Sequence, residues 1–341
     1  MIVTLLILTT LYTFYMGYTD GSNAVATTVT TGAMRPRIAI CLSAAIQFGT
    51  TVLMYFLLKD MSVAATIGKG LVSSEVYSSI SSTKGFIYLL STLLSAIVWS
   101  LITYFLKQPN STSHTLLGGI IGAAIAAFGF SSVIWRNVLL RVVLIIFLAP
   151  FLSLLIGYAV NKLLRRLALR APMGTGKVVK VLQWVNVGVL SAAISLNDAQ
   201  KAIGVYILIA SLGVAAIPTA PPFYLVAIFG AALAFGMIFG GYRIIITIGK
   251  KLYRIKPLMS LSSQIATNIV MFSSSALGVP VSTGQVISST VVGIGVSERA
   301  RGVKWQTVRR IALGWVVTMP ATILFGALFY LLTDLILGGI L

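Results

Sequence analysis

Two aspartates, Asp20 and Asp198, each stand inside a long apolar stretch of the sequence. A carboxylate near the middle of a bilayer costs roughly 2.5 to 3.5 kcal/mol even on a lenient insertion scale. We therefore expect a coupling cation, a proton or the nearby Lys201 to offset each acid. Residues 19–25 (TDGSNAV) are echoed by residues 197–203 (NDAQKAI), and this duplication favours a functional pair of acids over a purely structural ion pair between two halves.

Two short hydroxyl-rich segments also repeat, Ser111, Thr112 and Ser113 after Pro109, and Ser282 and Thr283 after Pro280. Proline followed by Ser or Thr and then an apolar run predicts a helix start with a hydroxyl cap. The free backbone N–H groups of a helix start attract anions. One such motif would be uninformative, but two that point inward from opposite faces predict a site for a tetrahedral oxyanion.

His114, the single histidine, follows the first hydroxyl-rich segment, and Gln285 holds the corresponding place in the second. A histidine there could donate to an anion or carry a proton. Because Gln285 cannot titrate, we favour a polar contact for His114 over a proton-carrying role.

The elements that must hold these residues are membrane-spanning helices. Of 341 residues, 58% are hydrophobic and 9% are charged, and the mean hydropathy is +1.00. A soluble domain carries about a quarter charged residues, so a water-soluble fold is excluded. Crossings need about 20 mostly apolar residues, and ten such stretches are visible: 1–33, 38–58, 86–106, 111–130, 139–161, 181–212, 223–248, 258–277, 282–296 and 311–341.

These stretches predict an all-α polytopic membrane protein in two halves of five crossings. Residues 1–161 form the first transmembrane repeat, residues 162–180 a basic cytoplasmic loop, and residues 181–341 the second repeat. Because five is odd, the second half enters from the opposite face and the repeat is inverted. Inverted repeats with broken helices and helix starts that meet near the midplane are typical of secondary transporters, and glycines at 17, 21 and 204 are expected to let the acid-bearing helices open.

Basic residues gather at 35–37, 107, 162–180, 250–256 and 299–310, which all fall on one side when the crossings alternate. The positive-inside rule then makes that side cytoplasmic and places both termini outside, in the cell membrane. The rule also accounts for the net charge of +19, so we do not infer nucleic-acid binding. Gly122 and Gly293 are expected to permit close helix packing, and the many small residues make a homodimer plausible.

Several functional classes are excluded by what the sequence lacks. It contains no P-loop for an ATP-driven pump. One His and one Cys, far apart, supply neither the nucleophile and base of an enzyme nor a metal cluster. We therefore expect no cofactor and no resident metal.

The motifs resemble those of the inorganic phosphate transporter (PiT) family, whose duplicated signature is close to G-x-N-D-x-A-N-A. Residues 17–27 are similar to its first copy and residues 195–204 to its second, and residues 108–115 and 278–283 resemble its serine-rich hairpins. Residues 301–310 resemble the lead into its last helix. The resemblance implies phosphate symport with sodium or protons by alternating access, with phosphate held by the hydroxyl-rich helix starts and by the Asn-Asp motifs, including Asn23 and Asn197.

Two positions depart from the family pattern: Thr19 and Lys201 stand where the signature often has Asn. A fixed ammonium at Lys201, beside Asp198, should repel sodium. We therefore expect proton coupling, similar to the bacterial low-affinity branch of the family, which the resemblance links to phosphate carried as a neutral metal–phosphate complex. The alternatives are a sodium-coupled phosphate symporter and a sulfate permease of the same family.

Overall fold

The computed structural model describes residues 1–57, 62–106, 108–170, 172, 174–214, 217–246, 253 and 255–339. The expected ends at residues 58, 247–248 and 340–341, the basic residue at 107 and most of segment 250–256 lie outside these ranges.

Every regular element in the described ranges is helical. The first half holds α1 (Ile2–Met16), the π-helical turn η1 (Gly17–Gly21), α2 (Asn23–Thr30), α3 (Pro36–Leu57), α4 (Ser62–Lys69), α5 (Ser74–Ser79), α6 (Ser82–Phe105), α7 (Thr112–Phe128), α8 (Trp135–Asn137), the π-helical turn η3 (Val138–Val143) and α9 (Leu144–Ala168). The second half holds α10 (Thr175–Ser211), α11 (Phe223–Ile246), α12 (Pro257–Ala276), α13 (Thr283–Arg299) and α14 (Trp305–Leu337).

Length and composition qualify 7 spans in the described part of the chain for crossing a membrane. The other three predicted crossings are the helices α7, α12 and α13. Helices α7 and α13 have 17 residues each, and α12 interleaves Ser, Thr, Asn and Gln with apolar residues. The all-helical polytopic membrane fold is thus confirmed.

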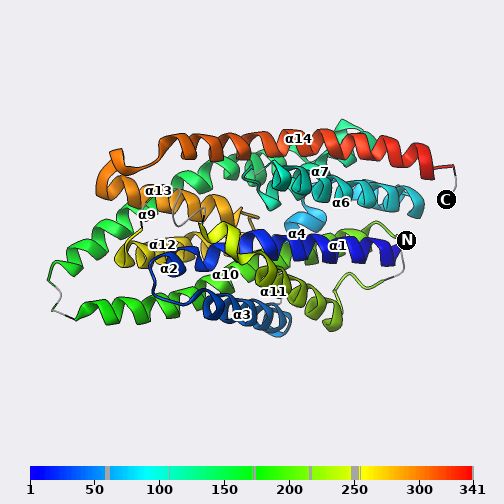
Figure 1. Cartoon of the computed structure of the whole chain (residues 1–341). Helices are drawn as coiled ribbons and strands as arrows, with labels where there is room; N and C mark the ends of the chain where they lie inside the picture. Colours follow the sequence, from blue (N-terminus) through cyan, green and yellow to red (C-terminus); the bar gives the residue numbers. More distant parts are fainter. Residues whose placement is uncertain are drawn as a thin grey trace.

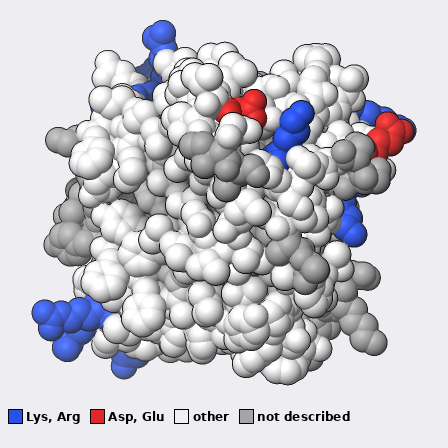
Figure 2. Space-filling model, turned by 90° about the vertical axis from the view of Figure 1, so that its right-hand side faces the viewer, with Lys and Arg blue, Asp and Glu red and all other residues white. Residues whose placement is uncertain are grey.

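The long helices lie side by side, and both termini are at one end of the molecule (Figure 1). The turns from α2 to α3, from α9 to α10 and from α13 to α14 lie at the opposite end (Figure 1). Viewed from the end with the termini, the surface consists mostly of uncharged residues, with only scattered Lys, Arg, Asp and Glu (Figure 2).

Helix contacts recur with the two halves exchanged. Helix α7 packs on α14 as α13 packs on α9, and α6 packs on α14 as α12 packs on α9. Helices α3 and α11 pack on each other, while α1 with η1 packs on α11 and α10 packs on α3. The last long helix of each half therefore covers the hairpin of the other half: α14 covers α6–α7, and α9 covers α12–α13.

Glycine permits the closest of these contacts. A Cβ at Gly122 on α7 would lie 1.9 Å from the Ile323 carbonyl oxygen of α14, and one at Gly293 on α13 would lie 2.0 Å from the Leu154 carbonyl oxygen of α9. A side chain at either position would collide with backbone, so the prediction of close packing at these glycines is confirmed.

Only one of the two acid-bearing helices is interrupted. The π-helical turn η1 separates α1 from α2 at Asp20, whereas α10 runs unbroken past Asp198. The expectation that both would open was therefore wrong. Asp198 and Lys201 are three positions apart on one helix face and pair without any break. Gly204 instead makes room for α4, since a Cβ there would lie 2.8 Å from Cβ of Ile67.

Candidate anion site between two hairpins

The acid on α10 is held by a lysine of the same helix. Lys201 Nζ lies 2.6 Å from Asp198 Oδ1, and both side chains are buried, with exposures of 0% and 1%. The other carboxylate oxygen, Asp198 Oδ2, has no protein partner among the described residues. The ion pair belongs to a single helix, so the alternative of a salt bridge between the two halves is wrong, and one acid oxygen is left free to accept a hydrogen bond.

The acid on η1 is held by the first hairpin. Thr112 Oγ1 donates to Asp20 Oδ2 at 2.5 Å, and Asp20 lies within electrostatic range of both Asp198 and Lys201. The hydroxyl of Tyr12, on α1, donates to the Thr112 carbonyl oxygen at 2.6 Å. The start of α7 is thereby fixed against the interrupted helix, and the three charged groups predicted from the sequence form one cluster.

The starts of α7 and α13 meet. Ser113 Oγ on α7 donates to the Val281 carbonyl oxygen, just before α13, at 2.7 Å. Ser111 caps α7, because its hydroxyl oxygen accepts from the His114 backbone N–H at 3.3 Å. Asn23 approaches from α2, with its amide nitrogen 3.8 Å from the position of a Cβ on Gly284. The tertiary structure thus brings together both hydroxyl-rich helix starts and the first copy of the repeated acidic motif, with Asp20 and Asn23.

The start of α13 differs from that of α7 because its polar atoms lack protein partners. Ser282 stands at the N-cap position without a side-chain capping hydrogen bond. Three buried atoms have no hydrogen-bond partner in the described part of the chain: Ser282 Oγ, Thr283 Oγ1 and Gln285 Nε2. Both amide atoms of the Asn197 side chain are likewise buried and without a partner there. A buried polar group without a partner costs about 1–3 kcal/mol. Such donors at a helix start can therefore hold an oxyanion with little reorganisation.

His114 and Gln285 face a common cavity. Both line a narrow pocket between α7, α9 and the start of α13, together with Ser282. The His114 ring is hydrogen-bonded to the backbone of Trp315, and its Nδ1 has no protein partner among the described residues. The free nitrogen of His114 therefore lies near the unpartnered donors of α13, and the polar-contact role of His114 stays a prediction.

All of the predicted site residues are buried, none more than 5% exposed. Sequence reasoning missed Tyr12 and a set of hydroxyls that joins α3 to α10, in which Thr51 and Ser195 are 2.8 Å apart and Ser195 donates to the Gln47 carbonyl oxygen. For Tyr12, the available signal was a hydroxyl-bearing residue inside an apolar run, two turns before Asp20. No group of three or more His, Cys, Asp or Glu side chains that could hold a metal is found in the described ranges.

Replacing Lys201 by methionine should destabilise the fold, because Asp198 then keeps a buried charge without its partner. Breaking one side of a buried ion pair costs about 3–5 kcal/mol. We expect a lower midpoint of thermal unfolding in detergent for K201M, and recovery in the double variant D198N/K201M. The matched control is K180M, which removes an exposed lysine from the same helix. Equal melting of K201M and K180M would contradict the assigned ion pair.

Comparison with known proteins shows which family this chain resembles. A model described as the phosphate transporter family matches residues 16–177 and 171–326. A probable low-affinity inorganic phosphate transporter of Rhizobium meliloti is 32% identical over 98% of this chain and 97% of its own length. One of Bacillus subtilis with the same description is 33% identical over 95% of both chains.

A solved structure described as the sodium-dependent phosphate transporter has the same fold. It superposes with a TM-score of 0.84 over 98% of this chain and 99% of the other, at 22% identity. The family match over most of the chain, together with full-length relatives above 30% identity, shows that this protein belongs to the phosphate transporter family.

Proposed function

We propose that this protein is a secondary active transporter that imports inorganic phosphate by cation symport with alternating access. The observation that carries the proposal is the start of α13, where buried hydroxyl and amide donors without protein partners adjoin the tip of the other hairpin. The descriptions of the relatives as inorganic phosphate transporters support the same substrate.

The charged groups of the site favour phosphate over sulfate. Phosphate retains a proton at neutral pH and can donate a hydrogen bond, whereas sulfate cannot. Asp198 Oδ2 is a buried acceptor without a protein partner in the described ranges, and Asp20 lies within electrostatic range of it. A protonated phosphate could satisfy such an acceptor, while a sulfate ion would only be repelled. The donors on the other side of this phosphate are then Ser282, Thr283, Gln285, Asn23 and Asn197.

We propose ten crossings in two inverted repeats, residues 1–161 and 181–341, joined by the basic segment 162–180, which is shorter as a loop than predicted because α9 extends to Ala168 and α10 begins at Thr175. The exchanged contacts support this division, because α7 on α14 and α13 on α9 are the same contact with the halves swapped. The two hairpins occupy opposite halves of the molecule, α6–α7 on the side of the termini and α12–α13 on the other (Figure 1). Alternating access requires two elements that can open one site to either face of the membrane in turn, and the two hairpins are in place to do so.

We further propose that protons rather than sodium drive the transport. The Lys201 ammonium already contacts Asp198 at 2.6 Å and lies within electrostatic range of Asp20. A sodium ion bound by either carboxylate would experience this fixed charge in a medium that screens it poorly. The solved structure with the same fold is described as sodium-dependent. Sodium coupling is therefore the alternative that the experiment must distinguish from proton coupling.

We also propose that both termini face the outside of the cell. They lie together at the end with few charges (Figures 1 and 2), while the turn from α2 to α3 and the turn from α9 to α10, both within basic stretches of the sequence, lie toward the other end. The positive-inside rule assigns the cytoplasm to the basic end.

The double variant S282A/T283V should bind phosphate more weakly because it removes two donors at the start of α13. A hydrogen bond to a charged group contributes about 1.5–3 kcal/mol, so we expect the KM for phosphate uptake into proteoliposomes to rise at least about tenfold. The control S274A removes a buried hydroxyl that donates to the Met271 carbonyl oxygen of its own helix. An unchanged KM in S282A/T283V would exclude these hydroxyls from the binding site.

The coupling ion can be identified from uptake of radiolabelled phosphate into proteoliposomes under an imposed proton gradient or an imposed sodium gradient. We expect the proton gradient to drive uptake, the sodium gradient to be ineffective, and excess unlabelled sulfate not to compete. In K201N, proton-driven uptake should fall and sodium dependence should appear, whereas K180N should behave as the parent. If K201N keeps the ion dependence of the parent, the role of Lys201 is wrong, and inhibition by sulfate would move the substrate assignment to sulfate.

The orientation is open to cysteine labelling in intact cells, because Cys41 is the single cysteine. In a C41S background, G339C near the C-terminus should react with a membrane-impermeant maleimide. The variant G176C, in the first turn of α10 within the basic segment 162–180, should react only after the cells are permeabilised. Nothing lies within 4 Å of a Cβ at either glycine, so neither substitution should perturb packing. The reverse labelling pattern would invert the topology.

A further inference from the structure

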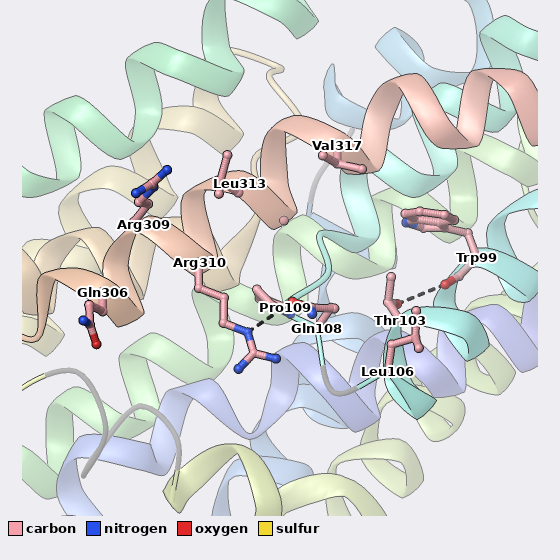
Figure 3. A pocket seen from close by; sticks show the side chains of 11 residues that line it. Trp99, Thr103, Leu106, Gln108, Pro109, Gln306, Arg309, Arg310, Leu313 and Val317 are labelled. Atoms are coloured by element: carbon pink, nitrogen blue, oxygen red, sulfur yellow. Dashed lines mark hydrogen bonds between the residues drawn. The ribbon is translucent and has the colours of Figure 1, made fainter.

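A second pocket lies outside the anion site, between the start of α14 and the end of α6. It has a volume of about 550 Å³ and is lined by Trp99, Thr103, Leu106, Gln108, Pro109, Gln306, Arg309, Arg310, Leu313, Gly314 and Val317 (Figure 3). None of these lining residues is acidic. Gln108 and Pro109 belong to the turn that leads into α7, so the pocket borders the hairpin that contacts Asp20.

The lining changes from basic to apolar along α14. Gln306, Arg309 and Arg310 are exposed near the first turns of the helix. Val317 is seven positions after Arg310, which corresponds to about 10 Å along a helix axis. The apolar part is formed by Leu106, Leu313 and Val317, which are 63%, 53% and 52% exposed. A ligand that fits this lining carries a negative charge at one end and an apolar chain at the other.

The basic end is not neutralised by the protein. The Arg310 Nε donates to Gln108 Oε1 at 3.4 Å, and neither Arg309 nor Arg310 forms a salt bridge with the described residues. Two adjacent arginines without acidic partners at the end of an apolar stretch attract anionic headgroups. The charge of the pocket is therefore complementary to a phosphate ester.

An unpartnered donor adds a second, independent sign of a ligand. Trp99 Nε1 is buried and has no hydrogen-bond partner among the described residues, although the ring lines the pocket. Figure 3 shows the nitrogen edge of the ring on the side where Gln108 and Arg310 lie. Buried indole N–H groups usually have an acceptor, and an ester or phosphate oxygen in the pocket would supply one.

The pocket also lies across a seam, the close backbone contact between α14 and the turn before α7. A Cβ at Gly314 would lie 2.8 Å from the Pro109 carbonyl oxygen, so α14 and the turn before α7 touch by backbone. A molecule seated in the pocket contacts both sides of this seam. It would stabilise the docked position of the hairpin that holds Asp20 through Thr112.

We propose that this pocket binds an anionic phospholipid, with the phosphate on Arg310 and Gln306, the charge of Arg309 on the neighbouring face of α14, and an acyl chain along Leu106, Leu313 and Val317 (Figure 3). Inorganic phosphate shares the headgroup chemistry. It would, however, leave the exposed apolar part of the lining without a partner, so the lipid accounts for more of the observed surface.

The test uses the full-length protein in phosphatidylcholine bilayers that contain a minor fraction of brominated phosphatidylglycerol or, separately, of brominated phosphatidylcholine. Quenching by bromine is assigned to Trp99 by subtracting the signal of W99F, since the chain has 5 tryptophans. We expect Trp99 to be quenched preferentially by the anionic lipid. In R309Q/R310Q this preference should fall about fivefold per arginine removed.

The matched control is R299Q/R301Q, which removes two exposed arginines from the same region that do not line the pocket. It should retain the preference of the parent. Equal quenching of Trp99 by the two lipids, or equal loss of preference in both double variants, would overturn the site. Relief of quenching by excess inorganic phosphate would assign the basic end to free phosphate and overturn the lipid proposal. Because no step measures transport, the result is independent of the proposed function.

Discussion

The structure depends on how two buried carboxylates are compensated where water is scarce. Asp198 is compensated by Lys201 from one turn away, at 2.6 Å. Asp20 has no such local partner. It receives a hydrogen bond from Thr112, at the start of a helix 92 positions further along the chain. Inside a membrane every polar group must find a partner within the protein or in a water-lined cavity, so the positions of α1, η1, α7 and α10 relative to one another are tied to these two acids.

This difference in compensation explains why the two related motifs have different backbones. The local ion pair lets α10 continue as a regular helix through Asp198. Asp20 lies in a π-helical turn that begins at Gly17, where a Cβ would lie 2.1 Å from the Leu233 carbonyl oxygen of α11. Wide helical turns of this kind occur frequently at functional sites. The same sequence pattern therefore serves two physical arrangements, one self-contained and one completed by a hairpin.

The two hairpins differ in a way that follows from the first constraint. The hydroxyls of α7 are engaged within the protein, Ser111 as a cap, Thr112 on Asp20 and Ser113 on the Val281 carbonyl oxygen. Those of α13 are buried without protein partners in the described part of the chain. One helix start thus holds the site together, while the other keeps its donors available. An anion that binds there would complete the hydrogen bonding of α13, which links occupancy of the site to the position of that hairpin.

Much of this protein was determined by the sequence alone. The apolar stretches and the small number of charges fix a polytopic helical membrane fold, because no soluble core could bury that surface. The repeated acids and hydroxyl-rich segments identify the residues that gather at the site, because polar groups within apolar runs need one another. Only the tertiary structure decided which atoms pair. The sequence could not distinguish a lysine that pairs within α10 from one that bridges the halves, nor show that Tyr12 and Thr112 support Asp20. Hydrogen bonds between positions about 100 residues apart depend on how helices pack, and that packing depends on backbone contacts at single glycines that no local pattern reveals.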